Sequence, residues 1–158
     1  MTPKSLLRLP AAASTLDELA NGRFHRVLHD ELADPDKVTR VLMCSGKIYY
    51  ELADERSRRA DPTIAIVRLE KLYPWWPKLV EPSYAKYRKL AELFWVQDEP
   101  CNMGAGTFVT PRIHKLIAGK PITYDFIGRA ESASPATGSH KAHVMEQQQI
   151  LRQAFDPR

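Results

Sequence analysis

The stretch KVTRVLMCSGKIYYELADERSRRADPTIAIVRLE, residues 37–70, decides the fold of this chain. Its pattern predicts an apolar strand over residues 38–44, a turn at Ser45-Gly46-Lys47, an amphipathic helix over residues 48–60 and a second apolar strand over residues 63–69. A helix that joins two strands of buried composition makes them a parallel pair with a right-handed crossover. The carboxyl ends of both strands are therefore expected at one edge of a sheet.

The segments on either side continue this alternation. Before it, we expect a short capped helix over residues 15–20 and an edge strand over residues 24–28, which the loop at residues 33–36 makes antiparallel. After it, the pattern predicts a helix between residues 77 and 90 that is interrupted by Pro82 or begins near it. A strand over residues 93–97, a loop over residues 98–106 and a helix over about residues 111–118 follow. The last predicted elements are a strand over residues 122–127, a loop over residues 128–138, and a helix that Ser139 caps and that runs to about residue 154.

Strands that alternate with helices predict an α/β fold. We expect a doubly wound, mainly parallel sheet of about five strands, with one antiparallel edge strand and helices on both faces. At 158 residues the chain has the length of one domain.

The composition excludes several classes of function. The 23 Lys and Arg residues against 19 Asp and Glu give a net charge of +4, but the charges are interspersed and form no basic stripe of the kind that binds nucleic acid. No apolar run approaches the ~18 residues that a membrane span needs, so we expect neither nucleic acid nor a membrane as partner. Cys44, in a predicted buried strand, and Cys101, in a predicted loop, form no disulfide framework, which favours a reducing, cytoplasm-like compartment.

Ligands of open sheets bind outside the carboxyl ends of the strands. At that edge Gly46 would let an anion approach the first N–H groups of a helix, and Lys47 and Arg68 would add two cations. With Ser45, these residues form a candidate site for the phosphate group of an effector.

A purely structural role for the same cations is the alternative. Lys47 would then be solvated, and Arg68 would pair with Asp98 or Glu99 at the end of the third strand. Ion pairs at strand ends are common, so spacing alone favours the structural role.

Other residue patterns are weaker. His25 and His29 have the spacing of a metal pair only if they lie on a helix, and no third ligand is apparent. His140 and His143 could share a helical face, but no partner residue is apparent, which favours a surface or packing role. The aromatic segment 73–77 would cover the sheet or dock on another domain. No phosphate-binding glycine motif and no Gly-x-Ser-x-Gly turn occur, so we assign no catalytic residue and no metal ligand.

Six stretches carry a resemblance to a known family. They are MTPKSLLR (residues 1–8), VLMCSGKIYYEL (41–52), IVRLEKLYP (66–74), WVQDEPCNMGA (95–105), GRAESASPATG (128–138) and HVMEQQ (143–148). In this order they resemble the C-terminal domain of the thiamine-diphosphate-dependent, decarboxylating first component of the 2-oxoglutarate dehydrogenase complex. The resemblance covers essentially the whole chain.

The resemblance implies a transketolase-type C-terminal domain of a much longer subunit. Residues 1–23 would then be the approach segment from an upstream domain, and residues 24–158 the domain itself. In this family thiamine diphosphate and magnesium lie between the two preceding domains of a homodimer, and no residue of that cofactor or catalytic set maps onto this chain. We therefore expect no cofactor and no activity in this chain alone. Where the family usually has an aromatic residue after Asn-x-Gly-Ala, this chain has Gly106, which predicts a more mobile loop.

The resemblance also implies the function of the full-length parent. The parent would oxidatively decarboxylate 2-oxoglutarate and deliver a succinyl group to the lipoyl arm of the succinyltransferase component, as part of the citric acid cycle. It would do so in the bacterial cytoplasm, or in the mitochondrial matrix of a eukaryote. This chain would serve assembly and regulation, and because some family members respond to nucleotides or acyl-coenzyme A at this domain, the resemblance favours the effector site.

Two alternatives stay open at this point. The chain could be a free-standing nucleotide- or coenzyme A-binding module that uses the same strand edge. It could also be the matching domain of another transketolase-like enzyme, such as a pyruvate dehydrogenase. The segment at residues 1–8 favours the first interpretation, because an independent module would not need it.

Overall fold

The sheet is built outward from β2 (Arg40–Cys44), in which every residue is buried. The computed structural model describes residues 3–156. Its five strands have the order β1-β3-β2-β4-β5, with β1 at Val27–Leu28, β3 at Ile64–Leu69, β4 at Glu92–Pro100 and β5 at Thr123–Arg129. β2 is parallel to both β3 and β4, β4 is parallel to β5, and only β1 is antiparallel to its neighbour. The predicted doubly wound, mainly parallel α/β fold is confirmed.

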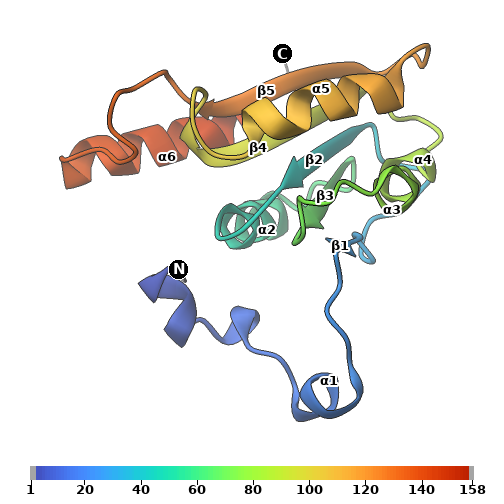
Figure 1. Cartoon of the computed structure of the whole chain (residues 1–158), viewed down its shortest axis with the longest axis horizontal. Coiled ribbons are helices and arrows are strands. Elements are labelled where there is room, and N and C mark those ends of the chain that lie inside the picture. The colour runs from blue at the N-terminus through green and yellow to red at the C-terminus, as the bar shows by residue number, and fades with distance from the viewer. Residues whose placement is uncertain (1–2, 157–158) are drawn as a thin grey trace.

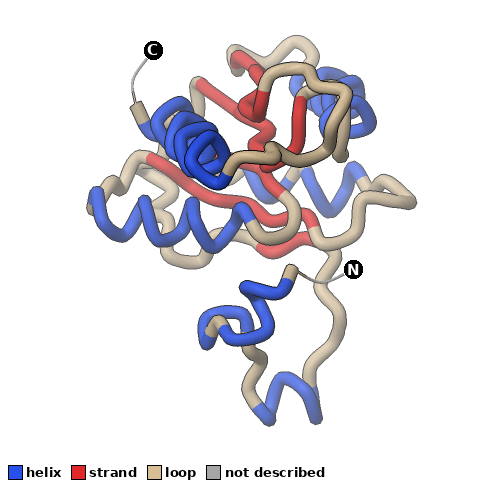
Figure 2. The backbone as a smooth tube through the Cα atoms, turned by 90° about the vertical axis from the view of Figure 1, so that its left-hand side faces the viewer, coloured by secondary structure: helices blue, strands red, loops and turns tan. Residues whose placement is uncertain are grey.

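Helices cover both faces of the sheet (Figure 2). On one face α2 (Ile48–Arg59) and α6 (His140–Phe155) pack over side chains such as Leu42 and Ile66. On the other face α3 (Pro77–Val80), α4 (Pro82–Ala85) and α5 (Gly106–Ile117) pack over a core that includes Met43 and Trp95. Alternate residues of the central strands point into the two cores, which is why these strands read as continuous apolar runs.

Several predicted boundaries are confirmed. α2 begins and ends within one residue of its prediction, and Ser139 caps α6 through a hydrogen bond that its hydroxyl accepts from the N–H of Ala142 at 3.4 Å. The edge strand is antiparallel as expected but only two residues long. The predicted interruption at Pro82 separates α3 from α4.

Three boundaries were wrong. Residues 98–100 belong to β4 and not to a loop, because Pro100 pairs with Arg129 beyond an irregularity in the register, and β5 likewise runs on to Arg129. α5 begins at Gly106, five residues before the prediction, since the carbonyl of Ala105 accepts hydrogen bonds from the N–H groups of Phe108 and Val109. Pro111 lies inside this helix, where it removes a single N–H donor.

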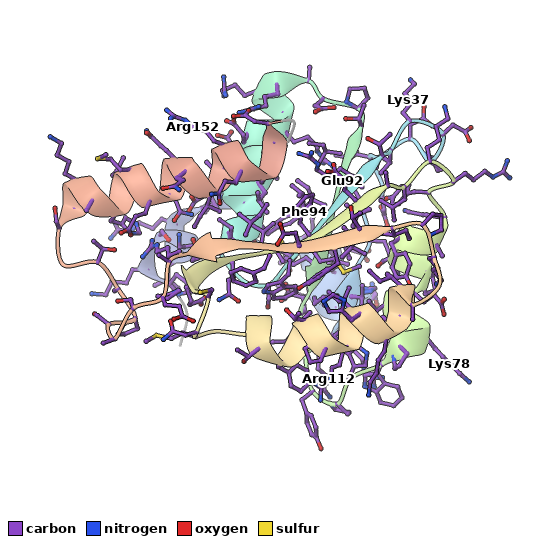
Figure 3. All side chains as sticks on the ribbon, turned by 90° about the horizontal axis from the view of Figure 1, so that it is seen from above. Lys37, Lys78, Glu92, Phe94, Arg112 and Arg152 are labelled. Atoms are coloured by element: carbon purple, nitrogen blue, oxygen red, sulfur yellow. The ribbon has the colours of Figure 1, made fainter. Side chains whose placement is uncertain are left out.

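At the opposite edge of the sheet, where the strands begin, Arg40 connects β4 with the end of α6. Its guanidinium pairs with Glu92 at 2.7 Å and donates to the carbonyls of Ala154 and Asp156 at 2.9 and 3.1 Å. It also lies 5.2 Å from the ring centre of Phe94; Glu92 and Phe94 are labelled on β4 in Figure 3. Arg40 thereby satisfies carbonyl groups at the end of α6 that the helix itself leaves unpaired.

The N-terminal segment lies apart from the sheet (Figure 1). It contains two 3₁₀ turns, η1 (Lys4–Arg8) and η2 (Pro10–Ala12), and the helix α1 (Leu16–Asn21). Thr15 caps α1 in a reciprocal arrangement with Glu18, which explains how six residues can form a helix. No residue from 3 to 23 is buried, so this segment adds nothing to either core.

The last turn of α2 contains an ion-pair cluster that predicts a pH dependence. Glu55 accepts hydrogen bonds from Arg58 and Arg59, and these bonds lower the pKa of its carboxyl group to about 2. The unfolded chain holds Glu at a pKa of ~4.3, so the stabilisation is complete above that pH and is lost as the pH falls toward 2. Glu55→Gln should cost about 0.5–1 kcal/mol of unfolding free energy at pH 7 and less at pH 3.

Urea unfolding of the wild type and the variant at both pH values measures this difference. Glu31→Gln, at an exposed position, is the matched control and should change stability little at either pH. An equal cost of Glu55→Gln at pH 3 and pH 7 would contradict the assignment.

Candidate functional site at the carboxyl edge of the sheet

The turn after β2 lies at the carboxyl edge of the sheet, where the sequence places the candidate phosphate site. Gly46 has a φ of 75°, a left-handed conformation that glycine adopts without strain, and nothing lies within 4 Å of the position of a Cβ atom. α2 begins directly afterwards at Ile48, and no side chain caps it. The N–H groups of Tyr49 and Tyr50 already donate to the carbonyls of Gly46 and Lys47 at 3.4 and 3.1 Å. An anion at this edge would therefore meet the N–H groups that precede them.

Lys47 is not a free cation. Its ammonium group lies 2.7 Å from the carboxylate of Glu51 and 3.4 Å from that of Asp98, with only 27% of the side chain exposed. Burial opposes the charge of Lys47, but these two carboxylates outweigh it and raise its pKa. The expectation of a solvated Lys47 was wrong, and Asp98 pairs with Lys47 instead of with Arg68.

Arg68 is held by a different set of groups. Its Nε lies 2.8 Å from the carboxylate of Glu70, close enough for an ion pair, yet the Nε–H has no hydrogen-bond acceptor. One terminal nitrogen donates to the hydroxyl of Tyr50 at 3.0 Å, and the guanidinium lies 4.3 Å from the ring centre of Tyr49. An anion at this edge must therefore compete with Glu51 and Asp98 for Lys47, and with Glu70 for Arg68.

The same edge continues as a polar network that sequence reasoning missed. The carboxylate of Asp98 accepts a hydrogen bond at 2.7 Å from Gln147 of α6. Arg129, at the end of β5, donates to Gln147 at 3.3 Å and to Nδ1 of His143 at 2.8 Å. Because a guanidinium can only donate, Nδ1 of His143 is the acceptor. A polar residue on the apolar face of a predicted helix, Gln147, was the only sequence signal for this network.

Arg129 also borders a cavity of about 560 Å³ between the loop 128–138 and α6. Its side chain is 9% exposed, and Glu146 lies 3.3 Å from its Nε. The carboxylate of Glu146 accepts a short hydrogen bond of 2.5 Å from the hydroxyl of Thr137. The loop 128–138 is therefore attached to α6 at this point.

A buried amide, Gln97, organises the connection from β4 to α5. Its Oε1 accepts hydrogen bonds from the indole of Trp95 and the N–H of Gly106, both at 2.9 Å. Its Nε2 donates to the carbonyl of Met103 at 2.8 Å. The expectation of a mobile loop at Gly106 was wrong: this residue is buried, and a Cβ atom there would lie 2.6 Å from the ring of Phe126.

The weaker sequence candidates form no site. Among residues 3–156 no group of three or more His, Cys, Asp and Glu side chains could hold a metal ion. Burial lowers the pKa of His29, the nearby charge of Lys86 adds to this effect, and Glu31 opposes it.

Neither cysteine forms a disulfide. Cys44 is fully buried, which raises the pKa of its thiol, and Cys101 is half-buried with a free thiol. In the described part of the chain, no helix is both long and apolar enough to cross a membrane.

Comparison with known proteins identifies the family. A model of the family described as "2-oxoglutarate dehydrogenase C-terminal" matches residues 13–155. The chain belongs to this family. It is similar to the oxoglutarate dehydrogenase of Buchnera aphidicola, with 42% identity over 99% of the chain, and to the 2-oxoglutarate dehydrogenase E1 components of Cupriavidus necator and Rickettsia felis, with 45% and 42% identity over 98%. The chain spans 16–17% of the length of these relatives.

The residues of this 2-oxoglutarate dehydrogenase C-terminal domain do not fit thiamine diphosphate with magnesium. No candidate metal cluster exists among the described residues, and carboxylates already neutralise both cations of the candidate phosphate site. We therefore derive no catalytic step from this domain.

Replacing Gln97 tests the organisation of the β4–α5 connection. Gln97→Leu leaves the Trp95 indole and the Gly106 amide without an acceptor in a buried site, and each unsatisfied group costs about 1–3 kcal/mol. We expect a loss of roughly 3 kcal/mol of unfolding free energy in urea titrations. Gln148→Leu, at an exposed position of α6, is the control; equal effects of the two substitutions would contradict this role of Gln97.

Proposed function

We propose that this chain is the non-catalytic assembly and regulatory domain of a 2-oxoglutarate dehydrogenase. The longer polypeptide would oxidatively decarboxylate 2-oxoglutarate and succinylate a lipoyl group in the citric acid cycle. The observation that supports this most is the family match over residues 13–155, combined with relatives about six times as long. Residues 1–23 would connect to an upstream domain, and residues 24–158 form the C-terminal domain.

The proposal assigns cofactors and partners to the longer protein. Thiamine diphosphate and magnesium would be held by the upstream domains, with a second subunit completing a homodimer. The lipoyl-bearing succinyltransferase would be the third partner, in the bacterial cytoplasm or in the mitochondrial matrix. Names of relatives that all refer to oxoglutarate dehydrogenase favour this enzyme over a pyruvate dehydrogenase.

Activity of the isolated chain is the direct test. Because no group of side chains among residues 3–156 forms a candidate metal site, we expect the 158-residue chain neither to bind thiamine diphosphate with magnesium nor to decarboxylate 2-oxoglutarate. Titration calorimetry and a dye-coupled decarboxylation assay measure the two properties, with a full-length family member as positive control. Clear activity of the chain alone would overturn the assignment.

A second role is effector binding at Ser45, Gly46, Lys47 and Arg68. We propose that a phosphate group of a nucleotide or of coenzyme A binds here as a regulator. The open backbone at Gly46 supports this role. Glu51, Asp98 and Glu70 oppose it, so the effector must replace carboxylates as partners of the two cations. A free-standing nucleotide-binding module would use the same residues.

Titration with AMP and with acetyl-coenzyme A, followed by the NMR signals of the Gly46 and Lys47 amides, tests this role. We expect saturable shifts at millimolar ligand and about tenfold weaker binding by Arg68→Gln, since a charge-assisted hydrogen bond contributes about 1.5–3 kcal/mol. Arg58→Gln, on the exposed end of α2, should bind as the wild type does. The absence of shifts, or equal binding by Arg68→Gln, would refute the site.

A further inference from the structure

The helix α1 carries an apolar and acidic surface that has no partner in its own chain. Leu16 is 86% exposed and Leu19 is 73% exposed. Asp17 and Glu18 lie between them, and their hydrogen bonds stay within the segment, to Asn21 and Thr15 respectively. The capping box makes α1 a formed helix before any contact is made.

A groove of the opposite character lies beside β1. It has a volume of about 490 Å³ and is lined by Arg23, Phe24, His25, Arg26, Val27, His29 and Leu79. Two of these residues are arginines, two are histidines and none is acidic. Phe24 is 70% exposed and Leu79 is 39% exposed, so the groove also offers apolar surface.

The cations of this groove are available for a partner. Among the described residues, neither Arg23 nor Arg26 forms an ion pair with a carboxylate. The guanidinium of Arg26 is held in place over the ring of Trp76, at 4.6 Å from its centre.

The helix cannot fill the groove of its own chain. Only Gly22 separates the end of α1 at Asn21 from Arg23, the first residue of the groove, and one residue of chain spans at most about 3.5 Å. In its own chain, α1 borders a smaller, adjoining cavity of about 250 Å³ that shares Arg23, Phe24 and His25 with the groove and is also lined by Arg68 and Glu70. Leu16 and Leu19 remain exposed in that position.

We propose that α1 of a second copy of this chain binds in the groove. Asp17 and Glu18 would face Arg23 and Arg26, and the two exposed leucines would cover Phe24 and Leu79. The exchange is reciprocal, so two identical contacts form around a two-fold axis, as in most homodimers. Each contact is small, because a helix of six residues is only about 9 Å long. The dimer is therefore weak and sensitive to salt.

This inference specifies a contact within the homodimer proposed above. It can fail separately, because it concerns residues 16–29 and Leu79 and not the family to which the chain belongs. If the chain is monomeric, the contact between α1 and the groove does not exist. The proposed function is tested separately, by the cofactor-binding and decarboxylation assays.

Charge reversal on each side of the contact provides a decisive experiment. Sedimentation equilibrium of the 158-residue chain should show a concentration-dependent dimer at low salt. Asp17→Arg alone and Arg26→Glu alone should each weaken it at least about tenfold, because each homodimer then brings like charges together twice.

Mixing the two variants in equal amounts should restore the dimer. One contact then joins the arginine introduced by Asp17→Arg to the glutamate introduced by Arg26→Glu, with the two charges exchanged. The other contact keeps the wild-type pair of Asp17 and Arg26. Dimerisation should therefore return to within about threefold of the wild type.

Lys141→Glu, at an exposed position of α6, is the matched control and should dimerise as the wild type does. Four results would overturn the inference. They are a monomeric wild type at millimolar concentration, a mixture that associates no better than its components, an equal weakening by Lys141→Glu, and a dimer that is indifferent to salt.

Discussion

The rest of the structure depends on the pairing of β2 with strands on both sides and its burial on both faces. Residues Arg40–Cys44 pair in parallel with β3 on one side and with β4 on the other, and none of these residues is more than 7% exposed. Such a strand is stable only if helices cover both faces of the sheet, which α2 and α6 do on one side and α3 to α5 on the other. The same pairing brings the carboxyl ends of β3, β2 and β4 to one edge.

That edge contains charged groups that satisfy one another. Carboxylates contact Lys47 and Arg68, and Asp98 continues the network through Gln147 to Arg129. A ligand here gains little from bare charge, because each new contact replaces an existing one. This distinguishes the edge from the N-terminal groove, where Arg23 and Arg26 have no carboxylate partner among the described residues. The edge thus suits an effector of modest affinity, whereas the groove suits a protein surface of opposite charge.

The function rests on a different kind of observation from the fold. The fold alone would suit many activities, so the fold does not identify the reaction. The order of six sequence stretches, and then the family match over residues 13–155, connect the domain with 2-oxoglutarate dehydrogenase. The exposed α1 helix and the basic groove are surfaces of this domain that a partner could cover.

The sequence by itself determined the parallel pair formed by β2 and β3, the antiparallel edge strand, the cap at Ser139 and the effect of Pro82, because periodicity and capping act over a few neighbouring residues. It also placed Ser45, Gly46, Lys47 and Arg68 near one edge. Only the tertiary structure decided that Asp98 pairs with Lys47 and Glu70 with Arg68, that β4 extends to Pro100, and that α5 begins at Gly106. The physical reason is that these features depend on which strands are neighbours and on buried partners such as Gln97 and Phe126, which lie too far along the chain for any local pattern to reveal.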